Sequence, residues 1–276
     1  MAGSPRPRSR PHKFLGQHFL TDARILRRIV DALEPAPDDL VLEIGAGAGT
    51  LTQALLARGV QVIAIEKDRR LAAELREWGV ESGSRLLVVE GDALDLDWPS
   101  LAASLESVTS NSPLPGFKVV GNIPYYITSP LIDKALTPPL PERVVFLVQA
   151  EVADRLVAAP GSKRYGALSV GVRSLCRVER LFAVKAGSFH PPPKVDSAVI
   201  RLRPLHTPLV DRQGILRFRE FVVACFSRRR KQLRNVMRSM TGRPAGSVDA
   251  GLAALGLVPH ARPETVAPED FVRLWR

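Results

Sequence analysis

Short apolar runs alternate with amphipathic stretches through the first three quarters of the chain. The apolar runs predict buried strands of a parallel sheet, at 40–45, 60–65, 86–90, 117–121 and 143–148. The stretches between them carry apolar residues at helical spacing, as in the helix predicted from a cap at Thr21 or Asp22 to Leu33. Two further runs, 178–185 and 195–202, alternate as antiparallel strands. This order predicts an α/β fold with a mostly parallel open sheet and an antiparallel edge hairpin.

The pattern changes to wholly helical after residue 205. Apolar residues recur at helical spacing through 217–240, and two shorter helices are predicted at 247–255 and 268–275. The predicted domains are therefore an α/β domain at 13–205 and a small all-helical domain at 206–276. Residues 1–12 are rich in Pro and Arg and lack an apolar anchor, so a disordered basic tail is predicted there.

Four candidate functional residues lie where predicted strands end. In open α/β sheets the ligand lies outside the carboxyl ends of the strands, and Gly45, Glu66, Asp92 and Asn122 all fall there. The turn at 45–49 reads GxGxG, one residue short of the dinucleotide GxGxxG, so a pyrophosphate cradle is not implied. Glu66 could accept the hydroxyls of a ribose, or be a surface residue. Asp92 could accept from an adenine amine, or cap a helix.

Asn122-Ile123-Pro124-Tyr125 follows the fourth strand and could form a clamp for an exocyclic amine, which we call the amine clamp. The Asn122 side-chain oxygen and a main-chain carbonyl beside Pro124 can accept the two amine hydrogens, which aims the nitrogen lone pair at an electrophile. Tyr125 offers a flat face for the ring. These four residues alone are equally compatible with a plain turn after a buried strand.

Composition narrows the class of protein. The 276 residues are 45% hydrophobic and 24% charged, as in soluble globular proteins, and the longest apolar run, near 144–148, is far shorter than a membrane span. The N-terminus does not resemble a secretory signal. Cys176 and Cys225 have no metal-type spacing and indicate buried thiols in a reducing compartment. We therefore expect a cytoplasmic protein without a membrane anchor or a metal.

The net charge of +11 is confined to the two ends of the chain. Residues 1–13 contribute +4 and residues 206–276 contribute +7, while 14–205 carries equal numbers of acids and bases. This distribution predicts contact with a polyanion. The predicted RNA-binding residues are five cations without acidic neighbours in sequence, whose alternative role is a solvated face: Arg228, Arg229, Arg230, Lys231 and Arg234.

Several motifs, in order from Lys13 to Trp275, resemble the ribosomal RNA adenine dimethyltransferase family. They are KFLGQHFL, EIGAGAG, Glu66, the GDA at 91–93, NIPYYITSP, FHPPPKVDSAVIRL and FSRRRKQLRN. Two positions depart from the family pattern, because His18 and Tyr126 stand where Asn is frequent.

The resemblance implies a Rossmann-like methyltransferase sheet and S-adenosylmethionine as methyl donor. The substrate implied is 16S rRNA in the assembling 30S subunit, where two adjacent adenosines near the 3′ end are dimethylated, and a monomeric enzyme is expected. The donor-binding residues implied are Gln17, His18, Leu20, Gly45, Ala46, Gly47, Glu66, Lys67, Asp92, Ala93 and Asn122. At the target base, Asn122 and the Pro124 carbonyl would hold the amine, with Tyr125 on one ring face and Phe189 on the other. No metal is needed.

Three rival functions stay open at this point. A macrolide-resistance type of methyltransferase, acting on large-subunit rRNA, shares the N-terminal half, although FSRRRKQLRN favours the small subunit. A DNA adenine methyltransferase would more often have an acidic residue in place of Asn122. A binding factor could keep the fold without the chemistry, although intact Asn122, Tyr125 and Glu66 argue against this.

Overall fold

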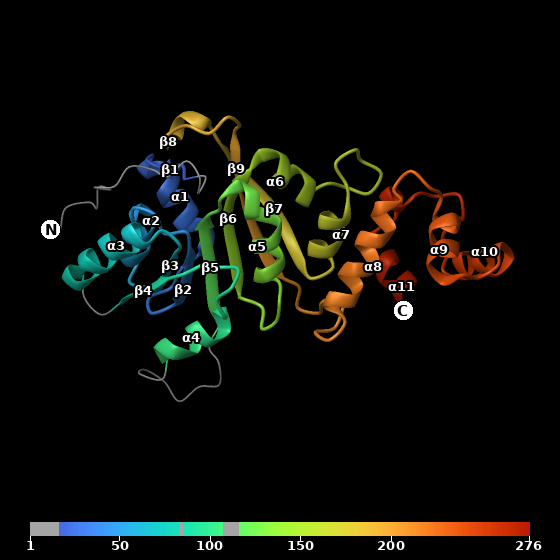
Figure 1. The fold of residues 1–276 in the computed structure, drawn as a ribbon, viewed down its shortest axis with the longest axis horizontal. Coiled ribbons are helices and arrows are strands. Elements are labelled where there is room, and N and C mark those ends of the chain that lie inside the picture. The colour runs from blue at the N-terminus through green and yellow to red at the C-terminus, as the bar shows by residue number, and fades with distance from the viewer. Residues whose placement is uncertain (1–16, 83–84, 107–115) are drawn as a thin grey trace. The chain divides into compact units, whose positions relative to one another are not determined.

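The computed structural model describes residues 17–82, 85–106 and 116–276, so the predicted tail at 1–12 and the KFLG segment at 13–16 lie outside the described residues. The chain forms two compact units (Figure 1). One contains the residues up to 153 together with 179–203, and the other contains 154–178 and 204–276. Among the described residues, none of the helices has the length and apolar character needed to span a bilayer.

A seven-stranded sheet confirms the predicted α/β fold. Five parallel strands form its main part: β2 (Leu40–Ile44), β3 (Gln61–Glu66), β4 (Leu86–Glu90), β5 (Phe117–Asn122) and β6 (Arg143–Gln149). The edge is formed by β9 (Ser197–Pro204), which runs antiparallel to β6, and β7 (Cys176–Val184). The spatial order is β4-β3-β2-β5-β6-β9-β7. Chain order reverses between β2 and β5, so their carboxyl ends border the crevice where such sheets bind ligands.

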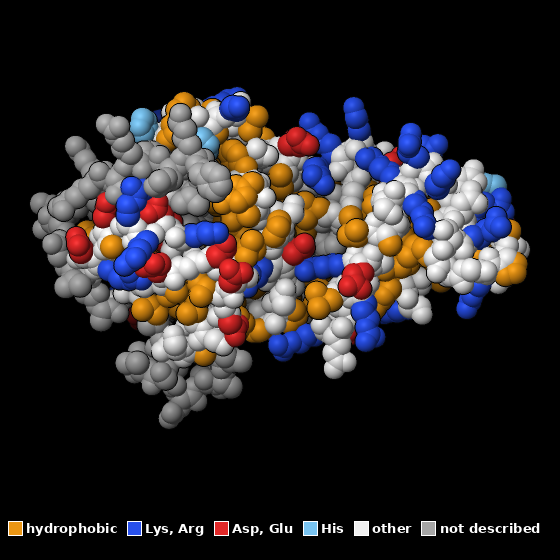
Figure 2. All heavy atoms as spheres, in the orientation of Figure 1, with side chains coloured by type: hydrophobic (Ala, Val, Ile, Leu, Met, Phe, Trp, Pro, Cys, Tyr) orange, Lys and Arg blue, Asp and Glu red, His pale blue; other side chains and the backbone are white. Residues whose placement is uncertain are grey.

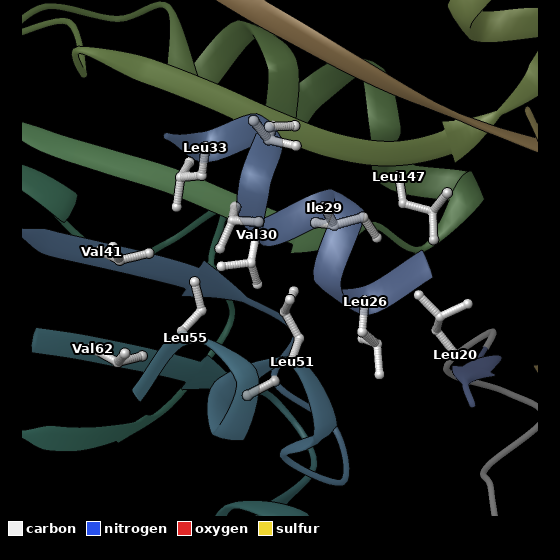
Figure 3. Close-up of a cluster of buried hydrophobic side chains, with 14 of the residues drawn as sticks. Leu20, Leu26, Ile29, Val30, Leu33, Val41, Leu51, Leu55, Val62 and Leu147 are labelled. Carbon is white, nitrogen blue, oxygen red and sulfur yellow. The ribbon is translucent and has the colours of Figure 1, made fainter. Parts of the chain in front are cut away.

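Helices bury the sheet on both faces. They are α1 (Ala23–Leu33), α2 (Thr50–Leu56), α3 (Arg69–Ser82), α4 (Trp98–Glu106), α5 (Thr128–Ala135) and α6 (Ala150–Leu156). Side chains alternate across a strand, so Val41 and Val62 pack in the cluster with α1 and α2 (Figure 3) while Leu42 is buried on the other face. Asp22 caps α1, as predicted, by accepting from the backbone N–H of Arg24 at 2.9 Å.

A small second sheet ties the N-terminal segment to a connector far along the chain. Strand β1 (Phe19–Leu20) pairs antiparallel with β8 (Phe189–His190), so that Leu20 lies opposite Phe189. Leu20 and Phe189 are both part of the buried core cluster. The segment around residue 19 therefore docks on the fold.

The second compact unit is built mainly of helices. They are α7 (Ala167–Arg173), α8 (Ile215–Ser227), α9 (Leu233–Thr241), α10 (Ala245–Ala254) and α11 (Pro268–Trp275). The continuous helical stretch predicted at 217–240 is wrong, because the helix breaks at 228–232. The first N–H groups of α9 are instead satisfied by distant carbonyls, with Leu233 donating to Ala261 at 2.6 Å and Arg234 to Pro259 at 3.1 Å.

The division of the chain differs from the predicted boundary at 205. Residues 154–178 group with the C-terminal helices, because α7 packs on α8 and α11. The buried Tyr165 donates its hydroxyl to the carbonyl of Val266 at 2.8 Å, and its ring meets Phe226 edge-on. These contacts join positions about 60 to 100 residues apart, which a reading of local patterns does not detect.

Candidate active site

A cavity opens at the carboxyl ends of β2, β3, β4 and β5, with about 1080 Å³ of empty space that includes some open solvent. All of the residues predicted to bind the donor line it, and so do three of the four residues predicted to act on the target base. The exception is Phe189. The predicted convergence of strand ends on one site is therefore present in the folded chain.

The glycine turn after β2 forms the floor of the cavity. Gly45 and Gly47 have φ of 70° and 58°, a region that other residues rarely adopt. A Cβ on Gly47 would also come within 3.0 Å of the Phe19 ring. The N–H of Gly47 donates to Glu66 Oε2 at 2.7 Å, which links this turn to the tip of β3.

Glu66 is a buried carboxylate held by main-chain donors. Its second oxygen, Oε1, accepts from the N–H of Asp68 at 2.8 Å. Burial raises the pKa of Glu66, although the main-chain hydrogen bonds oppose that rise. Each carboxylate oxygen has a further lone pair, so Glu66 can still accept from the hydroxyls of a ribose. It is therefore a fixed part of the cavity wall and not a surface residue.

Glu43, which was not predicted as a site residue from the sequence, also lines the cavity. It is the last residue but one of β2, is 1% exposed, and accepts from the Thr52 hydroxyl at 2.6 Å. Burial raises the pKa of Glu43 to about 8, and the nearby Glu66 adds to that rise. The sequence could have indicated it, because Glu43 is a charged residue in an otherwise apolar strand, and burying a charge costs free energy unless the charge is paired or neutralised.

Asp92 and Lys67 form an ion pair at the rim of the cavity. Lys67 Nζ lies 2.6 Å from Asp92 Oδ2, and Asp92 Oδ1 accepts from the N–H of Leu94 at 2.9 Å. The hydrogen bond from Lys67 is the main reason that the pKa of Asp92 is lowered. Asp92 therefore accepts a hydrogen bond within a local turn and also lines the cavity. The first contact resembles the predicted capping role, and the second leaves Asp92 in the place predicted for an adenine contact.

Asn122 has its amide oriented by a single hydrogen bond. Its Nδ2 donates to the main-chain carbonyl of His18 at 2.7 Å. Because a carbonyl can only accept, the nitrogen must face His18 and Oδ1 remains available as an acceptor. The tip of β5 approaches β2 closely at this point, and a Cβ on Gly121 would lie 2.6 Å from the carbonyl of Ile44.

Tyr125 is held at both ends of its side chain. The His18 ring stacks on it, with centroids 6.0 Å apart and planes inclined by 26°. The Tyr125 hydroxyl lies 2.6 Å from Ser197 Oγ at the start of β9. His18 is itself fixed, since its Nδ1 lies 2.7 Å from the carbonyl of Pro191 and must carry the proton. Ser197 and the supporting role of His18 were not predicted from the sequence.

The Pro124 carbonyl, predicted as the main-chain acceptor of the amine clamp, has other donors in the structure. The Pro124 carbonyl already accepts from the N–H of Ile127 at 3.2 Å and from the Thr128 hydroxyl at 3.4 Å. These bonds form because a 3-10 turn (Tyr125–Ile127) begins immediately after Pro124. Ile123 lines the cavity too, and its carbonyl is the neighbouring main-chain acceptor.

Phe189 does not reach the cavity, contrary to its predicted place over the target base. It is 4% exposed and packs in the core cluster that contains Leu20. The cause is the β1–β8 ladder, because alternate residues of a strand face opposite sides, and here Phe189 faces inward while His190 is exposed.

The five cations of the second unit do not all lack acidic partners, contrary to the sequence analysis. Arg229 pairs with Glu264 and also donates to the carbonyl of Lys163 at 2.9 Å, and Arg234 forms a two-pronged pair with Asp249. Glu264 lies 35 positions after Arg229, and Asp249 lies 15 positions after Arg234. Of the five predicted cations, three are exposed and have no ion pair with the described residues, and we call them the unpaired basic cluster: Arg228, Arg230 and Lys231. Figure 2 shows Lys and Arg side chains projecting from this unit.

No three His, Cys, Asp or Glu side chains gather as metal ligands within the described ranges. The two thiols are buried, and burial raises the pKa of Cys176 and of Cys225 to about 12 each.

The chain has a mostly parallel open sheet, with a glycine turn after β2 and the oriented amide of Asn122 at the end of the neighbouring β5. This arrangement defines it as a Rossmann-like methyltransferase. Within that class, the model of the family described as ribosomal RNA adenine dimethylase matches residues 8–271. The chain belongs to this family and is an rRNA adenine dimethyltransferase that uses S-adenosylmethionine. The match gives no support to the DNA methyltransferase or the non-catalytic factor.

Relatives and solved structures cover nearly the whole chain. Proteins named ribosomal RNA small subunit methyltransferase A are similar to it, with 42% identity in Synechococcus elongatus over 95% of this chain and 93% of the relative, and 41% in Moorella thermoacetica over 96% and 92%. The crystal structure of a Plasmodium falciparum dimethyladenosine transferase superposes with a TM-score of 0.78 and 29% identity, over 93% of this chain and 96% of that one. The 23S rRNA methyltransferase ErmE gives 0.67 and 33%, over 93% and 98%.

Proposed function

We propose that this enzyme dimethylates two adjacent adenosines near the 3′ end of 16S rRNA in the assembling 30S subunit, acting as a cytoplasmic monomer. The observation that carries the chemistry is the orientation of Asn122, whose Nδ2 is bound to the His18 carbonyl so that Oδ1 can accept. The choice of the small subunit rests on relatives of that name at 41–42% identity, against 33% for the 23S enzyme.

The donor would be held by the cavity residues already described. Gly45, Ala46 and Gly47 would contact the methionine part, Glu66 the ribose, and Asp92 with Ala93 the adenine, while Gln17, His18 and Leu20 would close over it. The residues fit this group, because Glu66 is a buried acceptor beside a turn whose glycines leave room for close approach. When bound, S-adenosylmethionine supplies a methyl group that is electrophilic without metal assistance.

The target adenine would leave its stack and enter beside Tyr125. Asn122 Oδ1 and the carbonyl of Ile123 would accept its two amine hydrogens, which withdraws the nitrogen lone pair from the ring. The ring would rest on the face of Tyr125 opposite His18, because His18 already stacks on the other face. Orientation of this kind can contribute several kcal/mol to the barrier reduction. The amine proton can leave to water after the methyl group has been transferred, so no side chain is required to act as a base.

The unpaired basic cluster would contact the phosphates of the RNA. Arg229 and Arg234 are paired with acids, so they would support the surface and not provide free charge. Each phosphate contact adds to the salt dependence of binding, which makes this assignment measurable.

The direct experiment is incubation with labelled donor and unmethylated small or large ribosomal subunits, followed by location of the modified bases. We expect dimethylated adenines at two neighbouring positions near the 3′ end of 16S rRNA. Label found only in 23S rRNA would support the macrolide-resistance type instead. Asn122→Ala, treated in the same way, controls for a contaminating methyltransferase.

A further inference from the structure

Tyr126 is an exposed aromatic residue at the rim of the active-site cavity. The residue is 61% exposed, whereas most large apolar residues of the first unit are buried. It lines the cavity with the amine clamp, yet none of the roles described above uses it. It also stands at a position where the family often has Asn, which has no aromatic ring.

The local backbone directs Tyr126 away from Tyr125. Both residues lie in the 3-10 turn at Tyr125–Ile127. A 3-10 helix has three residues per turn, so successive side chains point about 120° apart. Tyr125 is half-buried against His18 and Ser197, and Tyr126 is directed to solvent. The two rings therefore face different surroundings.

The position of Tyr126 suits a nucleobase rather than a phosphate. Lys67 is exposed at the same rim, but it is paired with Asp92, whose hydrogen bond is the main reason that the pKa of Lys67 is raised, so it does not supply free charge there. A flipped adenine also leaves its neighbour in the RNA without a stacking partner. An aromatic ring just outside the cavity can replace that partner, because every base has a π-face.

We propose that Tyr126 is a stacking subsite for the nucleobase next to the target adenine on the same RNA strand. The proposal rests on the proposed function, since it needs an adenine to enter the cavity from RNA. Tyr125 then positions the reacting base and Tyr126 its neighbour, from two consecutive residues of one turn.

Kinetics on unmethylated small subunits test the subsite. Tyr126→Ala and Tyr126→Asn should raise the KM for the subunit by about 5- to 100-fold, as expected for the loss of one base–aromatic stack, with a smaller change in kcat. Tyr126→Phe keeps the ring and should keep the KM within about twofold of wild type. Val223→Ala, at an exposed apolar residue of α8, is the matched control and should change nothing.

A binding measurement separates this inference from the proposed function. A single-stranded oligoadenylate with one 2-aminopurine beside an adenine should lose fluorescence on the wild-type protein with S-adenosylhomocysteine present, and Tyr126→Ala should abolish that quenching. A KM for Tyr126→Ala within twofold of wild type, or equal quenching by both proteins, would overturn the subsite even if the wild type methylates 16S rRNA. Tyr126-dependent quenching without methylation of 16S rRNA would keep the subsite and reject the proposed function.

Discussion

Asn122→Asp tests the amine clamp by changing one group while keeping the shape of the side chain. The acceptor Oδ1 survives, but the donor that bonds the His18 carbonyl at 2.7 Å is replaced by an oxygen. Two acceptors then face each other, and an unsatisfied polar group in such a site costs about 1–3 kcal/mol. When this free-energy penalty displaces the acceptor oxygen that holds the reacting amine, it raises the barrier to methyl transfer. The transfer rate at pH 8 should then drop by about 5- to 150-fold.

The same substitution should respond to pH in a specific direction. Repulsion by the His18 carbonyl favours the protonated carboxyl, so its pKa should rise by about one to two units from an ordinary value near 4. The protonated form can donate to that carbonyl again. The rate of the variant relative to wild type should therefore increase as the pH falls from 8 towards about 5.

Single-turnover transfer of labelled methyl groups to small subunits, between about pH 5 and 8.5, measures both effects. Asn122→Ala is the companion variant, since it removes the acceptor and should lower the rate by about 10²- to 10³-fold while donor binding remains measurable by calorimetry. A rate for Asn122→Ala within threefold of wild type, or a pH-independent ratio for Asn122→Asp, would refute the orientation assigned to this amide.

Three further predictions concern the donor, the RNA and the buried acid. Glu66→Ala should weaken donor binding by about 1–3 kcal/mol in calorimetry, and an unchanged affinity would remove Glu66 from the donor site. Replacing the unpaired basic cluster with Ala should reduce the slope of log affinity for RNA against log salt by up to about 3, whereas Arg234→Ala should lower stability and leave the slope nearly unchanged. Folded Glu43 keeps its proton up to about pH 8 while the unfolded chain releases it near 4.5, so stability should fall as pH rises through this window. Glu43→Gln should flatten that fall in chemical denaturation, and an unaltered profile would mean that Glu43 ionises normally.

The strand tips were predictable from the sequence because each apolar run stops at a polar or glycine residue. Glu66 and Asn122 close two such runs, and a parallel sheet necessarily brings its carboxyl ends to one edge. The burial of Phe189 was not predictable in the same way, since it follows from pairing with Leu20 about 170 positions away. The acid that neutralises Arg229 is likewise brought near only by the fold of the second unit.

Residue 18 contacts both the amine clamp and Tyr125 and also lines the cavity. Its main-chain oxygen orients the amide of the amine clamp, and its ring stacks on Tyr125. Under the proposed assignment, a substitution at residue 18 should alter donor binding and acceptor alignment together, so neither property is expected to change in isolation. Directed evolution at residue 18 would therefore change donor binding and acceptor alignment together. To change one of these properties alone, substitutions would have to be made elsewhere in the chain.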